Sequence, residues 1–134
     1  MTNAILLTNN GKKIFLNRIT KSTPDYTELN QFKVGTEQDD PTVNDEDLTT
    51  PTDLTGSGVY FKNFVSGYPT INETELYSII RCFLETTEAN GNELNGFGIF
   101  NSDSTEKLGI ITKFSSVTKN EYNQVAFVVK IQVI

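Results

Sequence analysis

The sequence predicts a mainly β protein, an antiparallel β-sandwich-like domain with one short N-terminal helix. Nine Phe and five Tyr among 134 residues, with no Trp, favour strands because aromatic side chains suit a pleated, half-buried surface. Five or six apolar runs of strand length are separated by turn residues, a pattern typical of sandwiches. The length suits one hydrophobic core, so we expect a single domain spanning residues 1–134.

A short helix is expected over residues 9–18. Thr8 is a suitable N-cap, because its hydroxyl can accept a hydrogen bond from a backbone N–H of the first turn. The apolar residues that fall near one face of this helix are Ile14, Phe15 and Ile19. Gly11 weakens the prediction, since Gly costs about 1 kcal/mol relative to Ala inside a helix.

Further apolar segments are expected to be strands. They are residues 29–34, 59–65, 96–101 and 108–114. In the first of them, Phe32 and Val34 share one face. The sequence ends on its clearest alternation, in which one face of a strand carries Val125, Phe127, Val129, Ile131 and Val133.

Residues 74–86 fit two structures. Their apolar positions match the spacing of a helix, and Asn72 with Glu75 resembles a capping box. The same run fits a fully buried strand, which also shows no alternation. The pattern alone slightly favours the helix.

The composition argues against several classes of function. The net charge of −6 and the pI near 4.6 argue against nucleic acid, whose binders carry basic patches. With no His, the chain lacks Ser–His and Cys–His nucleophile activation. Cys82 is the only Cys, so no internal disulfide can form, and we expect a buried, inert thiol. No run approaches the ~20 apolar residues that span a bilayer. We expect no enzyme activity, no cofactor and no membrane partner.

Residues 37–47 form an acidic segment. Its carboxylates belong to Glu37, Asp39, Asp40, Asp45, Glu46 and Asp47. The segment does not fit a calcium EF-hand loop, because Pro41 is present and the central Gly is missing. An irregular calcium site would use Asp39, Asp40, Asp45 and Asp47. The preferred interpretation needs no metal, because Thr42 can cap a short helix with Asp45 three residues later.

Aromatic residues after the acidic segment have two interpretations. They could form a sugar-stacking platform, which would make the protein a small carbohydrate- or cell-surface-binding module. Aromatic side chains on a strand more often contact the core or a partner protein. The candidate partner-interface residues are therefore Tyr60, Phe61, Phe64 and Tyr68, with Glu37, Asp39 and Asp40 of the acidic segment.

Two stretches are more specific together than either is alone. They are FKVGTEQDDPTVNDEDL at residues 32–48 and EANGNELNGFGIFNSDSTEKLGIITKFSSVTKNE at residues 88–121. Together they resemble the N-terminal domain of bacteriophage tail-collar fibre proteins and related short virion proteins. Counterparts of that family's motifs occur in order at residues 6–15, 34–35, 41–48, 88–91, 97–100, 101–103 and 111–113.

The resemblance implies a virion structural protein, an adaptor in the tail, baseplate or neck that attaches a fibre or ring component to neighbouring virion proteins. It implies a trimer or hexamer in the particle and synthesis in the host cytoplasm. Long family members continue into a shaft and a receptor-binding tip, which have no counterpart here, so host recognition is not implied. The resemblance also implies that residues 74–86 form a strand, joined as a hairpin to the next strand by the turn at 88–91.

Overall fold

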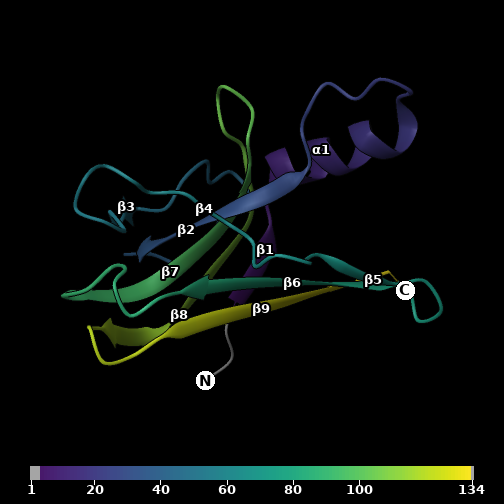
Figure 1. Ribbon diagram of the computed structural model, residues 1–134. Coiled ribbons are helices and arrows are strands. Elements are labelled where there is room, and N and C mark those ends of the chain that lie inside the picture. The colour runs from purple at the N-terminus through teal and green to yellow at the C-terminus, as the bar shows by residue number, and fades with distance from the viewer. Residues whose placement is uncertain (1–3, 134) are drawn as a thin grey trace.

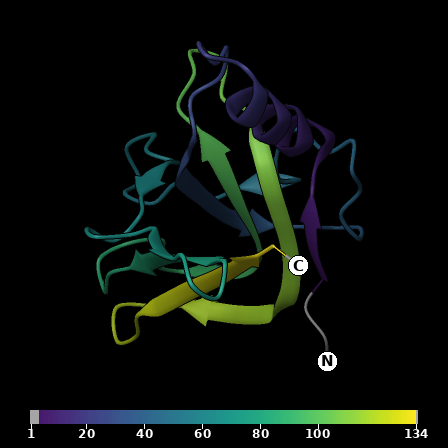
Figure 2. The ribbon, with the colours of Figure 1, turned by 90° about the vertical axis from the view of Figure 1, so that its right-hand side faces the viewer.

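The computed structural model describes residues 4–133, which form two antiparallel sheets and one helix (Figures 1 and 2). The first sheet has the order β1–β8–β7–β2–β3, with β4 also paired with β2, and the second has the order β5–β6–β9. The elements are β1 (Ala4–Leu7), α1 (Asn9–Thr20), β2 (Leu29–Thr36), β3 (Thr50–Pro51), β4 (Lys62–Asn63), β5 (Thr70–Asn72), β6 (Tyr77–Leu84), β7 (Asn92–Asn101), β8 (Leu108–Lys119) and β9 (Val125–Gln132). The predicted sandwich-like fold with a short N-terminal helix is confirmed.

Helix α1 begins at the end of β1 and is fixed to β8 by its first turn. The hydroxyl of the fully buried Thr8 accepts the N–H of Gly11 at 3.0 Å and donates to the carbonyl of Leu108 at 2.6 Å. The N–H of Thr8 donates to the carbonyl of Gly109 at 2.9 Å. Thr8 therefore caps the helix, as predicted, and also attaches it to the sheet.

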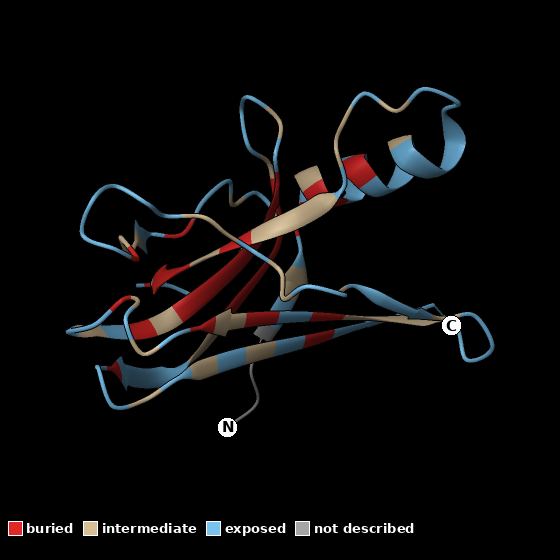
Figure 3. Cartoon of the chain, viewed as in Figure 1, coloured by how far each residue is buried: buried red, intermediate tan, exposed pale blue. Residues whose placement is uncertain are grey.

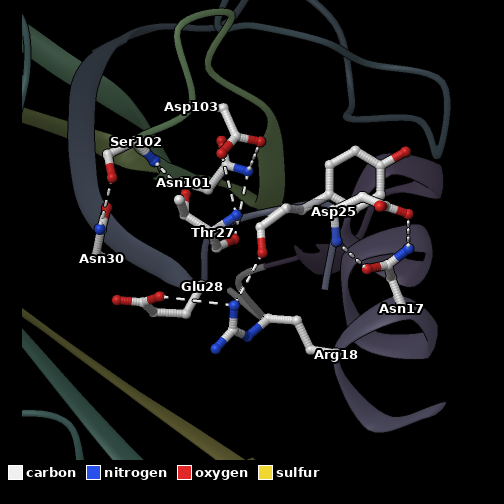
Figure 4. Close-up of polar contacts among 10 residues, drawn as sticks. Asn17, Arg18, Asp25, Thr27, Glu28, Asn30, Asn101, Ser102 and Asp103 are labelled. Atoms are coloured by element: carbon white, nitrogen blue, oxygen red, sulfur yellow. Dashed lines mark hydrogen bonds and ion pairs between the residues drawn. The ribbon is translucent and has the colours of Figure 1, made fainter. Parts of the chain in front are cut away.

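The C-terminal end of α1 is tied to the loop that follows it. Arg18 Nη1 donates to the carbonyl of Tyr26 at 2.8 Å, and Asn17 exchanges two hydrogen bonds with Asp25 (Figure 4). Hydrogen bonds from Lys21 and Asn17 lower the pKa of the Asp25 carboxyl below its ordinary value. The loop therefore folds back along the last turn of the helix.

The same loop is anchored to the turn that follows β7. Asp103 accepts the N–H of Thr27 at 3.0 Å, and the fully buried Asn101 donates to Asp103 at 2.9 Å (Figure 4). Asn30 Nδ2 donates to Ser102 Oγ at 2.8 Å. The 101–103 motif of the resemblance therefore has a structural role in this chain. It holds the α1–β2 connection against the sheet.

The main core lies between the two sheets. Phe97 of β7 stacks on Phe127 of β9 with ring centroids 4.4 Å apart, and Phe32 of β2 lies 5.7 Å from Phe97. A second cluster covers the opposite face of the first sheet and contains Leu48, Phe100, Leu108 and Ile111. Strand β7 is covered on both faces, so every residue from 96 to 101 is buried (Figure 3). A strand of this kind shows no alternation in its sequence.

Residues 74–86 contain β6, so the strand prediction is confirmed and the helix alternative is wrong. Asn72 Oδ1 accepts the N–H groups of Thr74 and Glu75 at 3.0 and 2.8 Å, which closes a turn from β5 into β6. The predicted hairpin is also wrong. β6 pairs with β5 and β9, whereas β7 belongs to the first sheet, so residues 85–91 cross from one sheet to the other.

Contacts from distant parts of the chain hold this crossing connection. Ala89 and Gly91 adopt left-handed φ angles of 56° and 82°. The N–H of Gly91 donates to the carbonyl of Lys119 at 2.9 Å, and the N–H of Ala89 donates to the carbonyl of Leu54 at 2.8 Å. The buried Lys119 ammonium, whose pKa is lowered by burial, donates to Asn90 Oδ1 at 2.7 Å. These partners explain why a Gly-bearing turn here does not close a hairpin.

The predicted strand over residues 59–65 is largely wrong, because only β4 within it pairs with β2. The carboxylate of Asp53 accepts hydrogen bonds from the backbone N–H groups of Thr55, Gly56, Gly58 and Val59. This arrangement curls residues 53–59 into a compact loop that leads the chain away from the ladder. Phe61 and Phe64 contact the rest of the protein through their side chains, although their backbone is not part of a strand.

Gly11→Ala should destabilise the protein by about 1–3 kcal/mol. The same change stabilises an unobstructed helix by up to about 1 kcal/mol. Here a Cβ would overlap the carbonyl oxygen of Gly109 and lie 2.8 Å from the Leu7 side chain. Urea unfolding measures the difference. Lys13→Ala, on the exposed side of α1, is the matched control and should change stability by no more than about 0.5 kcal/mol. A Gly11→Ala protein as stable as the parent would contradict close packing of α1 on β8.

Cys82 should resist thiol reagents in the folded protein. Its side chain is fully buried between the sheets, and burial raises the pKa of the thiol to about 12. Reaction with a chromogenic disulfide at neutral pH should follow the urea unfolding curve. Labelling in buffer at the rate seen for the unfolded chain would show that the core opens locally at β6.

Candidate functional site

An apolar groove lies between α1, β1 and the end of β9. Its volume is about 680 Å³. The apolar residues that line it are Ile5, Leu7, Ile14, Phe15, Ile19, Leu29, Ile110, Val129, Ile131 and Val133. Some are largely exposed, with Ile5 at 61%, Ile19 at 64% and Val133 at 63%. A contiguous exposed apolar surface of this kind is typical of an interaction site.

The two strands that border the apolar groove are edge strands. β1 pairs with β8 and β9 pairs with β6, and neither has a second partner strand within residues 4–133. The outer N–H and C=O groups of such a strand can pair with an added strand. β9 also lacks the usual protection of an edge, since its eight residues include one charge, that of Lys130, and no Pro.

The polar side chains at the groove include two cations and one carboxylate. Arg18 Nη1 lies 3.8 Å from Glu28 Oε2, and Lys130 Nζ lies 4.4 Å from the centroid of the Tyr77 ring. Helix α1 itself carries basic residues and no acidic ones. The groove therefore favours an apolar segment that is neutral or acidic at its ends.

A smaller cavity of about 300 Å³ extends the apolar groove between β8 and β9. Ile5 and Val129 line both spaces, so the apolar surface is continuous along one open side of the sandwich. Figure 2 shows why this side is open, because β8 bends away from β1 in its C-terminal half. Phe114 and Val117 of that half line the smaller cavity.

The aromatic candidates from the sequence do not form one platform. Phe61 meets Phe100 edge-on with ring centroids 5.2 Å apart, under the ammonium of Lys33. Phe64 packs against the main core. Tyr60 is exposed and Tyr68 is half-buried, and they line two separate cavities, distinct from the apolar groove. The structure therefore distributes these four residues over four environments.

The acidic candidates also divide into inner and outer groups. Glu37 is buried, and its carboxylate accepts two hydrogen bonds from Thr49. One comes from the backbone N–H at 2.8 Å and the other from the hydroxyl at 3.0 Å. Asp39 and Asp40 are exposed, with Asp40 3.8 Å from Lys113 Nζ. Glu37 is thus a structural residue that connects β2 to the segment before β3.

The acidic segment is held by side-chain turns, and the short helix expected after Thr42 is wrong. The Asp45 carboxylate accepts the backbone N–H of Thr42 at 3.0 Å and the Thr42 hydroxyl at 2.9 Å. The chain forms a single turn there and no helix. Asp47 lies 3.1 Å from Lys33 Nζ. Within residues 4–133, no three Cys, Asp or Glu side chains gather as a set of metal ligands.

Sequence reasoning missed the groove because it assigned its residues to other roles. The sequence places Ile131 and Val133 on the same strand face as Val125, Phe127 and Val129, and the structure leaves these two residues at the groove. Phe15 and Ile19 share the predicted apolar face of the helix with Ile14, and both are more than half exposed. On the other face of the last strand, Val128 is 61% exposed and lines the smaller cavity.

Comparison with known protein families, with curated proteins and with solved structures gave no match to this chain. No helix within the described residues has the length and apolar character needed to cross a membrane.

Glu37→Ala should destabilise the protein by about 2–3 kcal/mol, because it removes two hydrogen bonds to a buried carboxylate and leaves the N–H of Thr49 without that partner. Asp39→Ala, two residues away and exposed, is the control and should change stability by no more than about 0.5 kcal/mol. Thermal unfolding of the purified variants compares them. Equal melting temperatures would show that Glu37 has no structural role.

Proposed function

We propose that this protein is a non-enzymatic structural subunit of a phage virion, an adaptor in the tail, baseplate or neck that attaches a fibre or ring component to neighbouring virion proteins. The main support for the proposal is the apolar groove, which lies beside two edge strands, β1 and β9, each with an outer side that has no partner strand within residues 4–133. A structural subunit that binds neighbouring proteins needs an exposed apolar surface, because burial of apolar area drives most protein association.

The binding mode that fits the groove is strand addition. An extended segment of a neighbouring subunit pairs with the outer edge of β9 and places alternate side chains on the groove floor. Backbone hydrogen bonds supply affinity in this mode, and the floor supplies specificity. The cationic rim formed by Arg18 and Lys130 selects a segment with acidic residues near its ends.

The resemblance to tail-collar fibre domains supports the same proposal. Its motifs lie at or next to residues where neighbouring strands and loops approach each other closely. A Cβ on Gly35 of the 34–35 motif would strike the backbone of Thr50. A Cβ on Gly96, which directly precedes the 97–100 motif, would lie 2.8 Å from Glu37 Cγ. These close approaches bring β2, β3 and β7 together beside the acidic segment. As implied by the family, the subunit forms a cyclic trimer or hexamer in the particle.

The proposal predicts that the chain is present in purified virions of the phage that encodes it, in a copy number divisible by three. Ile5→Glu should reduce its incorporation at least about tenfold, because a carboxylate on the groove floor would be buried without a partner. Quantitative mass spectrometry of particles made by complementation measures both quantities.

The matched control is Ile71→Glu, which places the same carboxylate on β5, an edge strand away from the groove. This variant should be incorporated normally. Absence of the wild-type chain from virions would refute the proposed function. Equal incorporation of the two variants would refute the apolar groove as the attachment site.

A further inference from the structure

We propose that a polar pocket on another part of the molecule binds a neutral sugar unit. The pocket lies where β2 and β3 meet the 53–59 loop and the crossing connection, and its volume is about 590 Å³. Ligand pockets commonly have volumes of about 300–1,000 Å³. It shares no lining residue with the apolar groove, so this inference is independent of the proposed function.

Hydroxyl groups supply the recognition chemistry of the polar pocket. Those available belong to Thr36, Thr50, Thr52 and Thr87, which line the pocket and whose hydroxyls form no hydrogen bond with another residue of the described range. A hydroxyl group can donate one hydrogen bond and accept two. Four hydroxyls around one pocket therefore match a ligand that itself carries several hydroxyls, because each hydroxyl can both donate and accept.

Tyr60 supplies an apolar surface at the same pocket. Tyr60 is 40% exposed and lines the pocket together with the threonines of β2 and β3. The electron-rich face of an aromatic ring attracts polarised C–H groups, which one face of a pyranose ring presents. A ring beside a set of free hydroxyls thus meets both the apolar face and the polar edge of a sugar.

Hydrogen bonds hold two walls of the polar pocket in place. The Asp53 carboxylate holds the 53–59 loop through backbone N–H groups, the shortest of these bonds being 2.7 Å from Gly58. Asn90 is fixed at both ends, because Oδ1 accepts from Lys119 at 2.7 Å and Nδ2 donates to the carbonyl of Thr86 at 2.7 Å. A preformed site loses less entropy on binding.

Charge selects a neutral ligand over an anionic one. The carboxylates of Asp53 and Glu93 line the polar pocket, and its lining includes no Lys or Arg. A phosphate, sulfate or uronate would face like charge there without a compensating cation. The chemistry therefore favours a neutral hexose or N-acetylhexosamine unit over a nucleotide or an acidic glycan.

Titration of the ¹⁵N-labelled protein with methyl glycosides of glucose, galactose, mannose and N-acetylglucosamine tests the inference by NMR. At least one should shift the amide signals of the pocket lining at millimolar concentration. The glucuronide and galacturonide should bind more weakly than the neutral sugar of the same configuration. No shift at the lining with any of the four sugars would overturn the inference, and so would uronide binding as tight as that of the neutral sugar.

Variants assign the binding to the polar pocket. Tyr60→Ala should weaken it at least about 5-fold, and Tyr60→Phe, which keeps the ring, should change it less than about 3-fold. Thr36→Val keeps the side-chain shape, removes one hydroxyl and should weaken binding roughly 3- to 10-fold. Tyr122→Ala is the control, because Tyr122 is 86% exposed and lies outside the pocket. Unchanged affinity in both Tyr60→Ala and Thr36→Val would also overturn the inference.

Discussion

The position of α1, and with it the apolar groove, depends on one close contact. In this contact the first turn of α1 lies directly against the backbone of β8. Thr8 hydrogen-bonds to the Leu108 and Gly109 carbonyls, and Gly11 leaves room for the Gly109 carbonyl. This contact holds α1 beside β1 and therefore creates one wall of the apolar groove. If a side chain separated the two backbones, the helix would move outward and the groove would lose its shape.

The open side of the sandwich follows from the way the chain crosses between its sheets. Residues 85–91 carry the chain from β6 to β7, so these consecutive strands belong to different sheets. Among the strands of residues 4–133, β9 pairs with β6 alone. The stacked rings of Phe97 and Phe127 hold the sheets together at the centre. β1 and β9 are left as neighbouring edges on one side, while the crossing connection forms a wall of the polar pocket.

The two candidate sites have opposite chemistry, and each suits a different ligand. The apolar groove presents aliphatic side chains and unpaired strand edges, a combination that fits a protein segment. The polar pocket presents hydroxyls, two carboxylates and one exposed ring, a combination that fits a neutral polyol. The two sites share no residue, so the proposed subunit contact and the proposed sugar site do not overlap.

The sequence by itself determined the fold class, the start of the helix and the strands β2, β7, β8 and β9, because these depend on local sequence pattern and capping. Thr8, Phe32 and the alternation from Val125 to Val129 are local signals of this kind, and the structure agrees with them. Only the tertiary structure decided that β6 and β7 lie in different sheets, since the partners that hold the turn at Ala89 are distant in sequence. It also separated the buried Glu37 from the exposed Asp39, two carboxylates that composition treats alike. Gly11 is the clearest case: its local cost in a helix is evident from sequence, but its purpose requires the position of Gly109, almost a hundred residues away.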